Sequence, residues 1–94
     1  MSDLKERWKT LYQQDLPQFA KDHNWLVYED HCIARIIYDH VAGDKWDRVW
    51  QKPAIHNINE NELEKCIAVG HQLMAGELNA EALNKKSLQY RGKI

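Results

Sequence analysis

The sequence predicts an all-α protein, a single domain (residues 1–94) of four to five short helices around one core. Three observations support this prediction. Apolar residues recur at helical spacing along most of the chain. Asn, Asp and Gly stand where those helices would begin and end. The short apolar run at residues 25–28 has no second run with which it would pair as a strand.

The first helix follows Ser2, a natural N-terminal cap, and carries Trp8 and Leu11 on its apolar face. Pro17 interrupts this pattern, because a proline inside a helix removes a backbone hydrogen bond and clashes with the preceding turn. Two outcomes are therefore open: the helix kinks at Pro17, or a second helix begins with Asp15 as its cap.

The next helix is expected to begin near Asp30 and to end at Gly43, since glycine is favoured just after a helix. A short helix follows from Asp44 through Trp50, and residues 51–59 form a connection. The longer helix has one strongly apolar face, which holds Cys32, Ile33, Ile36, Ile37 and Val41.

In the second half of the chain, Asn59 and Glu62 match a capping box at the start of a third long helix. Gly70 lies inside this helix, where glycine is costly, so it is expected to mark a close approach of two helices. Gly76 ends the helix, and Asn79 caps a last helix that runs to about Tyr90.

The bulk composition excludes several classes of protein. The formal net charge is −1, so no overall charge attracts the chain to nucleic acid or to an anionic membrane. No apolar run approaches the roughly 20 residues of a membrane span, and no secretory signal is visible. Cys32 and Cys66 each lie in a helical pattern, which favours reduced thiols and a cytoplasmic protein.

The stretch YEDHCIARIIYDH (residues 28–40) is the densest in reactive side chains. On a helix, His31, Arg35, Tyr38 and Asp39 would share the face opposite Ile33, Ile37 and Val41, with Arg35 and Asp39 four residues apart. One interpretation is a solvated or half-buried polar stripe with one ion pair. The other is a binding site in which Asp39 holds Arg35 toward an anionic ligand or partner, because a guanidinium binds such groups in a bidentate manner.

The same stretch does not predict catalysis or a metal site. General acid–base catalysis by His31 would need a cleft and a second positioned group. His31 and Cys32 are adjacent, so on a helix they point about 100° apart. Cys66 and His71 are five residues apart and also diverge. No glycine-rich phosphate loop is present. We therefore expect no catalytic residue, no metal and no cofactor.

Two other regions are candidate contact surfaces. Trp46 and Trp50 lie four apart on the short helix; they either pack into the core or line a groove or a dimer interface. The C-terminal stretch contains Lys85, Lys86, Arg91 and Lys93 around Tyr90. These residues suit phosphate contacts with base stacking, or else they complement the negative end of the last helix.

Three stretches in order resemble a small family of bacterial all-helical proteins: DHCIARIIYDHVAGDKW (residues 30–46), KPAI (52–55) and LNKKSLQYRGK (83–93). The family pattern reads D-H-C-[hydrophobic]-x-R-I, then a Trp, P-A, and L-N-x-x-S-L-x-[WY]-R-G-K. The resemblance covers about residues 4–93. The matching positions are Asp30, His31, Cys32, Arg35, Asp39, Trp46, Pro53, Ala54, Asn84, Ser87, Leu88, Arg91 and Gly92.

Members of that family carry the label of GNAT-type N-acetyltransferases, so the resemblance implies an acyltransferase or an accessory to one. No window of the chain matches the acyl-CoA loop pattern [QR]-x-x-G-x-[GA] of that class. If the helices that carry Arg35 and Arg91 pack side by side, their polar groups either line one pocket for an anionic ligand or form a buried network that fixes the helix register.

The sequence therefore predicts a small helical binding or interaction module that is not an autonomous enzyme. The expected binding residues are His31, Arg35, Asp39, Arg91, Trp46 and Trp50, and the partner is a protein or an anionic small ligand. The alternatives are an acyltransferase-associated protein and, less favoured, a nucleic-acid-associated protein that uses Lys85, Lys86 and Lys93. A homo-oligomer with a structural role is a further alternative.

Overall fold

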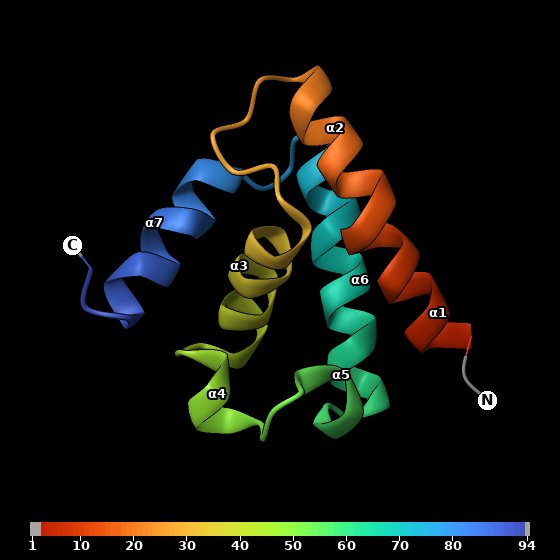
Figure 1. The fold of residues 1–94 in the computed structure, drawn as a ribbon, viewed down its shortest axis with the longest axis vertical. Coiled ribbons are helices and arrows are strands. Elements are labelled where there is room, and N and C mark those ends of the chain that lie inside the picture. Colours follow the sequence, from red (N-terminus) through yellow and green to blue (C-terminus); the bar gives the residue numbers. More distant parts are fainter. Residues whose placement is uncertain (1–2, 94) are drawn as a thin grey trace.

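The computed structural model describes residues 3–93, and every regular element within this range is helical. The all-α prediction is therefore confirmed (Figure 1). Among these residues, no helix has both the length and the apolarity that crossing a membrane requires. The elements are α1 (Asp3–Thr10), η1 (Leu11–Asp15), α2 (Leu16–Asp22), α3 (Asp30–Ala42), α4 (Trp46–Val49), α5 (Ala54–Asn57), α6 (Glu60–Met74) and α7 (Ala80–Tyr90).

The first three elements form one continuous helical run, and Pro17 does not divide it (Figure 1). The segment η1 is a π-helix, in which the N–H of Leu16 donates to the carbonyl of Leu11, five residues earlier. Pro17 follows in the first turn of α2, where its missing N–H costs least. The wider π-helical turn of η1, immediately before Pro17, thus lets the helix continue from α1 into α2.

Helix α3 lies between α7 and α6, and it also contacts η1, α2 and α4 (Figure 1). The predicted solvated or half-buried polar stripe of α3 holds for His31, which is exposed, and Arg35, which is half-buried, but is wrong for Tyr38 and Asp39. Tyr38 is only 7% exposed and Asp39 is 0% exposed, because α7 and α4 cover that side of the helix. The Tyr38 hydroxyl receives the indole N–H of Trp8 at 2.8 Å, which satisfies both buried polar groups.

The predicted helix ends are confirmed at three positions. Gly43 adopts a left-handed conformation (φ 74°) directly after α3. The side chains of Asn59 and Asn79 accept the backbone N–H groups of Glu62 and Ala82, at 2.8 and 2.9 Å. The stretch predicted as a connection, residues 51–59, contains the single turn α5, which is too short to show a helical period in the sequence.

Gly70 marks the predicted close approach, between α6 and the N-terminal helical run. A Cβ atom added at Gly70 would lie 2.5 Å from Cδ2 of Leu11 and 3.3 Å from Cδ1 of Leu16. Such a contact is shorter than carbon atoms tolerate. The buried apolar residues form one core between this helical run, α3 and α6, with Trp8, Leu16, Ile33, Ile36, Ile37 and Cys66 among its least exposed members.

Candidate functional site

The carboxylate of Asp39 is fully buried and accepts four hydrogen bonds. Arg91 donates to it twice, from Nε at 3.1 Å and from a terminal nitrogen at 3.0 Å. Ser87 Oγ donates at 2.5 Å, and the backbone N–H of Trp46 donates at 2.9 Å. These donors come from α7 and from the start of α4. A carboxylate with this set of partners joins three elements and has no free site for a ligand.

Arg35 does not pair with Asp39, which corrects the expected i,i+4 ion pair. Its guanidinium instead donates to the side-chain oxygen of Asn84 on α7, at 2.7 Å. The two arginines singled out in the sequence therefore both bind internal partners across the interface of α3 and α7. Of the two arrangements considered for these groups, the structure contains the internal network that fixes the register of the two helices.

The polar residues at the start of α3 are arranged differently. His31 has an exposed side chain (73%), and its Nδ1 lies 3.6 Å from a carboxylate oxygen of Asp30. One side-chain donor atom each of Glu29, His31 and Cys32 lies within 4.8 Å of the other two. The sequence argument against a metal site relied on the divergence of His31 and Cys32 on a helix; in the structure their donor atoms lie within 4.8 Å of each other.

The two tryptophans of the expected contact surface have different environments. Trp50 is 7% exposed, and its indole N–H donates to a carboxylate oxygen of Glu62 at 3.1 Å. Trp46 is half-buried, with its ring 5.7 Å from that of Tyr38. The expectation that both line an open groove is wrong for Trp50, because it completes the core beside Tyr38.

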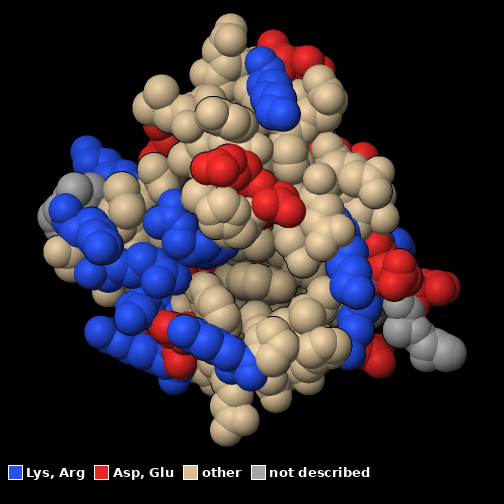
Figure 2. Space-filling model, in the orientation of Figure 1, with Lys and Arg blue, Asp and Glu red and all other residues tan. Residues whose placement is uncertain are grey.

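Cations are concentrated in residues 35–52 and 84–93, which we call the basic face. It holds eight of the thirteen Lys and Arg residues but only three of the fourteen Asp and Glu residues, a net charge of +5. The remainder of the chain then carries −6. Figure 2 shows Lys and Arg side chains gathered over α7 and α4. The eight cations are Arg35, Lys45, Arg48, Lys52, Lys85, Lys86, Arg91 and Lys93.

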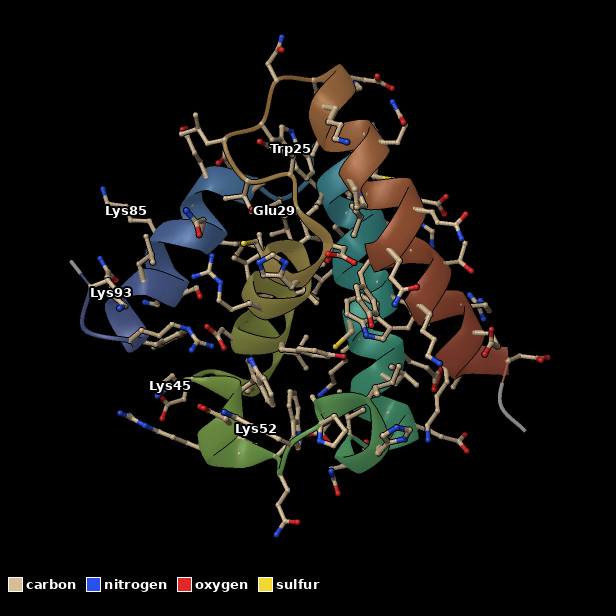
Figure 3. The ribbon with its side chains drawn as sticks, viewed as in Figure 1. Trp25, Glu29, Lys45, Lys52, Lys85 and Lys93 are labelled. Carbon is tan, nitrogen blue, oxygen red and sulfur yellow. The ribbon has the colours of Figure 1, made fainter. Side chains whose placement is uncertain are left out.

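The acidic residues within the basic face all have cationic partners. Asp39 binds Arg91, as described above. Asp44 lies 3.4 Å from Arg48, and Asp47 lies 3.8 Å from both Lys45 and Lys52. Figure 3 shows Lys45, Lys52, Lys85 and Lys93 on the same side of the molecule. The Asp39 network creates this face, because it holds the start of α4 and the end of α7 against α3.

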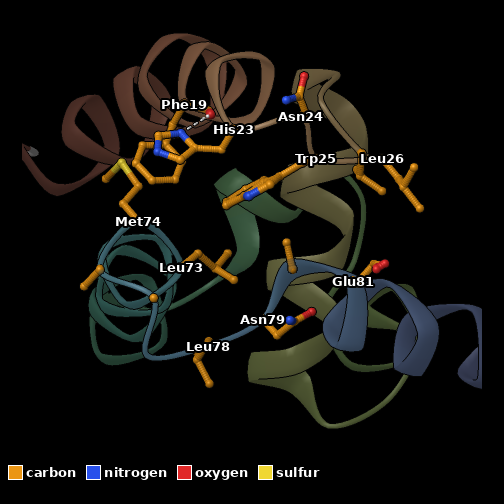
Figure 4. Close-up of a pocket in the computed structure, with 14 residues that line it drawn as sticks. Phe19, His23, Asn24, Trp25, Leu26, Leu73, Met74, Leu78, Asn79 and Glu81 are labelled. Atoms are coloured by element: carbon orange, nitrogen blue, oxygen red, sulfur yellow. Dashed lines mark hydrogen bonds between the residues drawn. The ribbon is translucent and has the colours of Figure 1, made fainter.

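A cavity of about 470 Å³ opens at the other end of α7, between the end of α2, the loop after it and the end of α6 (Figure 4). The rings of Phe19 and His23 stack at 3.8 Å, and Trp25 meets Phe19 edge-on at 5.4 Å. Leu73 and Met74 of α6 also line the cavity, with Met74 beside Phe19. The size and aromatic lining suit a small ligand or an inserted side chain. Sequence reasoning missed this cavity, because its walls come from two stretches far apart in the chain, residues 19–27 and 73–81.

Two buried groups are held in their neutral forms. Burial raises the pKa of the Cys66 thiol to about 12, and the charge of Glu62 adds to the shift. Burial also raises the pKa of Tyr38 well above its usual range, against the opposing hydrogen bond from Trp8. Both groups therefore stay protonated near neutral pH and act as packing residues, not as nucleophiles.

Comparisons of the chain with protein-family models, with curated proteins and with solved structures found no significant match.

Proposed function

We propose that this protein is a helical binding module whose basic face docks against an acidic partner. The observation that carries the proposal is the segregation of charge, +5 on the basic face against −6 on the remainder, in a chain of net charge −1. Complementary charge speeds association and selects partners. This arrangement would present the basic face to an acidic surface and turn the acidic remainder away from it.

The favoured partner is an acidic protein surface. Lys45 and Lys52 share Asp47, so part of the positive charge lies on side chains that already have a carboxylate beside them. The side chains of Lys45 and Lys52 are 31% and 72% exposed, so their ammonium groups remain accessible to carboxylates of a partner. Half-buried Trp46 lies next to these lysines and supplies apolar area at the same site.

The state of the buried acidic and thiol side chains favours a binding function over a catalytic one. The Asp39 carboxylate is occupied by four donors, and the Cys66 thiol stays protonated. These groups, which a sequence motif would nominate as acids or nucleophiles, serve the interior. We further propose that the protein acts in the cytoplasm of a bacterium, where thiols such as Cys32 and Cys66 stay reduced.

Nucleic acid is the second candidate partner, and α7 is the feature that favours it. Among the described residues, Lys85, Lys86 and Lys93 form no ion pair with a carboxylate. The ammonium of Lys86 lies 5.9 Å from the ring of Tyr90, which is half-buried and presents a stacking surface. Free lysines beside an aromatic ring are the elements of sequence-independent single-strand binding.

A binding titration separates the two candidates. Fluorescent polyglutamate and a fluorescent single-stranded oligonucleotide would each be titrated with the protein at low and high salt. We expect polyglutamate to bind and to weaken with salt. The Lys85→Glu/Lys86→Glu variant should lose about tenfold or more in affinity. The Lys21→Glu/Lys65→Glu variant makes the same charge change at exposed residues outside the basic face and should bind as the parent does.

The outcomes decide between the proposals. Oligonucleotide binding that exceeds polyglutamate binding at equal charge would favour the nucleic-acid candidate. No binding of either probe at low salt, or an equal loss in both variants, would overturn the role of the basic face. The acyltransferase association implied by the family resemblance stays a prediction. It requires an acyl-CoA to raise the thermal unfolding temperature, and no shift at millimolar ligand would reject it.

A further inference from the structure

The start of α3 brings three different metal-ligating side chains together at the surface. Glu29, His31 and Cys32 each offer one donor atom, and all three atoms lie within 4.8 Å of one another. From this geometry we infer that these residues form a binding site for a divalent transition metal of the zinc class. The site is independent of the proposed docking function, since none of its ligands belongs to the basic face.

The backbone explains why these neighbouring residues converge. Glu29 precedes the first residue of α3 and is extended (φ −82°, ψ 143°), so helical spacing does not govern where its carboxylate lies. His31 and Cys32 lie in the first turn of the helix. Figure 3 shows Glu29 at this end of α3, with Lys45 and Lys52 near the opposite end of the helix.

The donor set selects the class of metal. A thiolate, an imidazole and a carboxylate offer sulfur, nitrogen and oxygen, which suit zinc and its neighbours, whereas calcium and magnesium prefer oxygen alone. Zinc–ligand bonds of about 2.0–2.3 Å require the donor atoms to approach one another to roughly 3.3–3.8 Å. Glu29 and His31 are exposed and Cys32 is half-buried, so their side chains have the freedom to close by this amount.

The local charges favour a cation on balance. The positive end of the α3 dipole disfavours a bound cation. The carboxylates of Glu29 and Asp30 favour it, and so does the Cys32 sulfur once it has lost its proton. On binding, the Cys32 thiol gives its proton to solvent as the metal–sulfur bond forms. Asp30, whose carboxylate lies 3.6 Å from Nδ1 of His31 and accepts the His31 backbone N–H at 2.7 Å, adds a second negative charge beside the ligands.

Cobalt(II) provides the test, because a thiolate bound to cobalt gives a near-ultraviolet charge-transfer absorption that solvent-exposed carboxylates and histidines do not. Untagged, reduced protein would be titrated with cobalt(II), and the signal then displaced with zinc. We expect the band to form, to disappear in Cys32→Ser, and to need at least about tenfold more cobalt in His31→Ala and in Glu29→Gln. His40→Ala removes another exposed histidine of α3 and should leave the titration unchanged.

Each other result would overturn the site. No band in the parent protein means that the three residues do not bind the metal. A band that survives Cys32→Ser belongs to another group. A band that needs Cys32 but is unaffected by both His31→Ala and Glu29→Gln reports a single thiol that binds cobalt without a built site. Circular dichroism of each variant, compared with the parent, shows that the helices are retained.

Discussion

The polar residues at the two ends of α3 lie in opposite environments, buried at one end and exposed at the other. Near the C-terminal end, Asp39 is buried and receives donors from Ser87, Arg91 and the backbone of Trp46. At the N-terminal end, His31 is 73% exposed, and its closest ionic neighbour is the carboxylate of the adjacent Asp30. The same thirteen-residue stretch of sequence therefore contains a structural network at one end and available ligating groups at the other.

The difference comes from what packs against each end of the helix. The last helix, α7, lies along α3, and α4 adds a second contact near its C-terminal end. Burial forces every polar group there to find an internal partner, because an unsatisfied buried carboxylate is very costly. In the first turn of α3, Asp30 and His31 are exposed, and the Asp30 carboxylate bonds only locally, to the backbone N–H of His31. Residue type alone does not separate structure from site in this protein.

The largest expected effect is at Asp39. Replacing it in Asp39→Ala leaves the Arg91 guanidinium, which is 18% exposed, without its carboxylate. We expect a loss of about 3–5 kcal/mol in the free energy of unfolding, measured by urea titration. Asp30→Ala removes an exposed carboxylate from the first turn of the same helix and should cost about 1 kcal/mol or less. Equal losses in the two variants would remove the contrast between the ends.

The next effect concerns the two cysteines and pH. Burial raises the pKa of Cys66 from 9.0 to about 12, so the unfolded chain loses this proton at lower pH than the folded protein does. The folded protein then binds more protons across this window, and the free energy of unfolding falls as pH rises from 9 to 12. Urea unfolding at several pH values should show the decline, and Cys66→Ala should make it shallower, with the contribution of buried Tyr38 remaining. Cys32→Ala is the control and should leave the slope as it is.

The smallest expected effect is at His31. His31→Ala should change the free energy of unfolding by no more than about 0.5 kcal/mol, because the side chain is exposed and makes no buried contact. Urea titration at neutral pH provides the measurement. A loss above about 2 kcal/mol would place His31 in the structural network with Asp39 and would contradict the division of α3 into two parts.

Local signals predicted much of the fold. A single residue marks each of three helix ends: Gly43 through its positive φ, and Asn59 and Asn79 through their side-chain caps. The sequence alone was therefore enough to predict these ends. The partners of Asp39 were beyond such reasoning, since Ser87 and Arg91 lie 48 and 52 residues away. Helical periodicity places Asp39 on the polar face of α3 and so predicts that it is exposed. The packing of α7 against that face instead makes Asp39 the centre of a buried network.

The basic face shows the same limit. The lysines of α7 are visible as a cluster in the sequence, but Lys45 and Lys52 join them only because α4 and α7 meet at one carboxylate. Sequence analysis considered His31 and Cys32 for a metal site but not Glu29, which precedes α3 and is extended, so helical spacing does not predict where its carboxylate lies. The family resemblance singled out Arg35, Asn84 and Arg91, and it gave no partner for any of them.

A double-mutant cycle between Asp39 and Arg91 tests the account most directly. The free energies of unfolding of the parent, Asp39→Asn, Arg91→Gln and the double variant would be measured by urea titration. We predict that the two substitutions are coupled by more than about 1 kcal/mol, with the double variant less destabilised than the sum of the singles. Coupling near zero would mean that Arg91 is free to bind an external anion. The buried network would then not be what joins α3, α4 and α7.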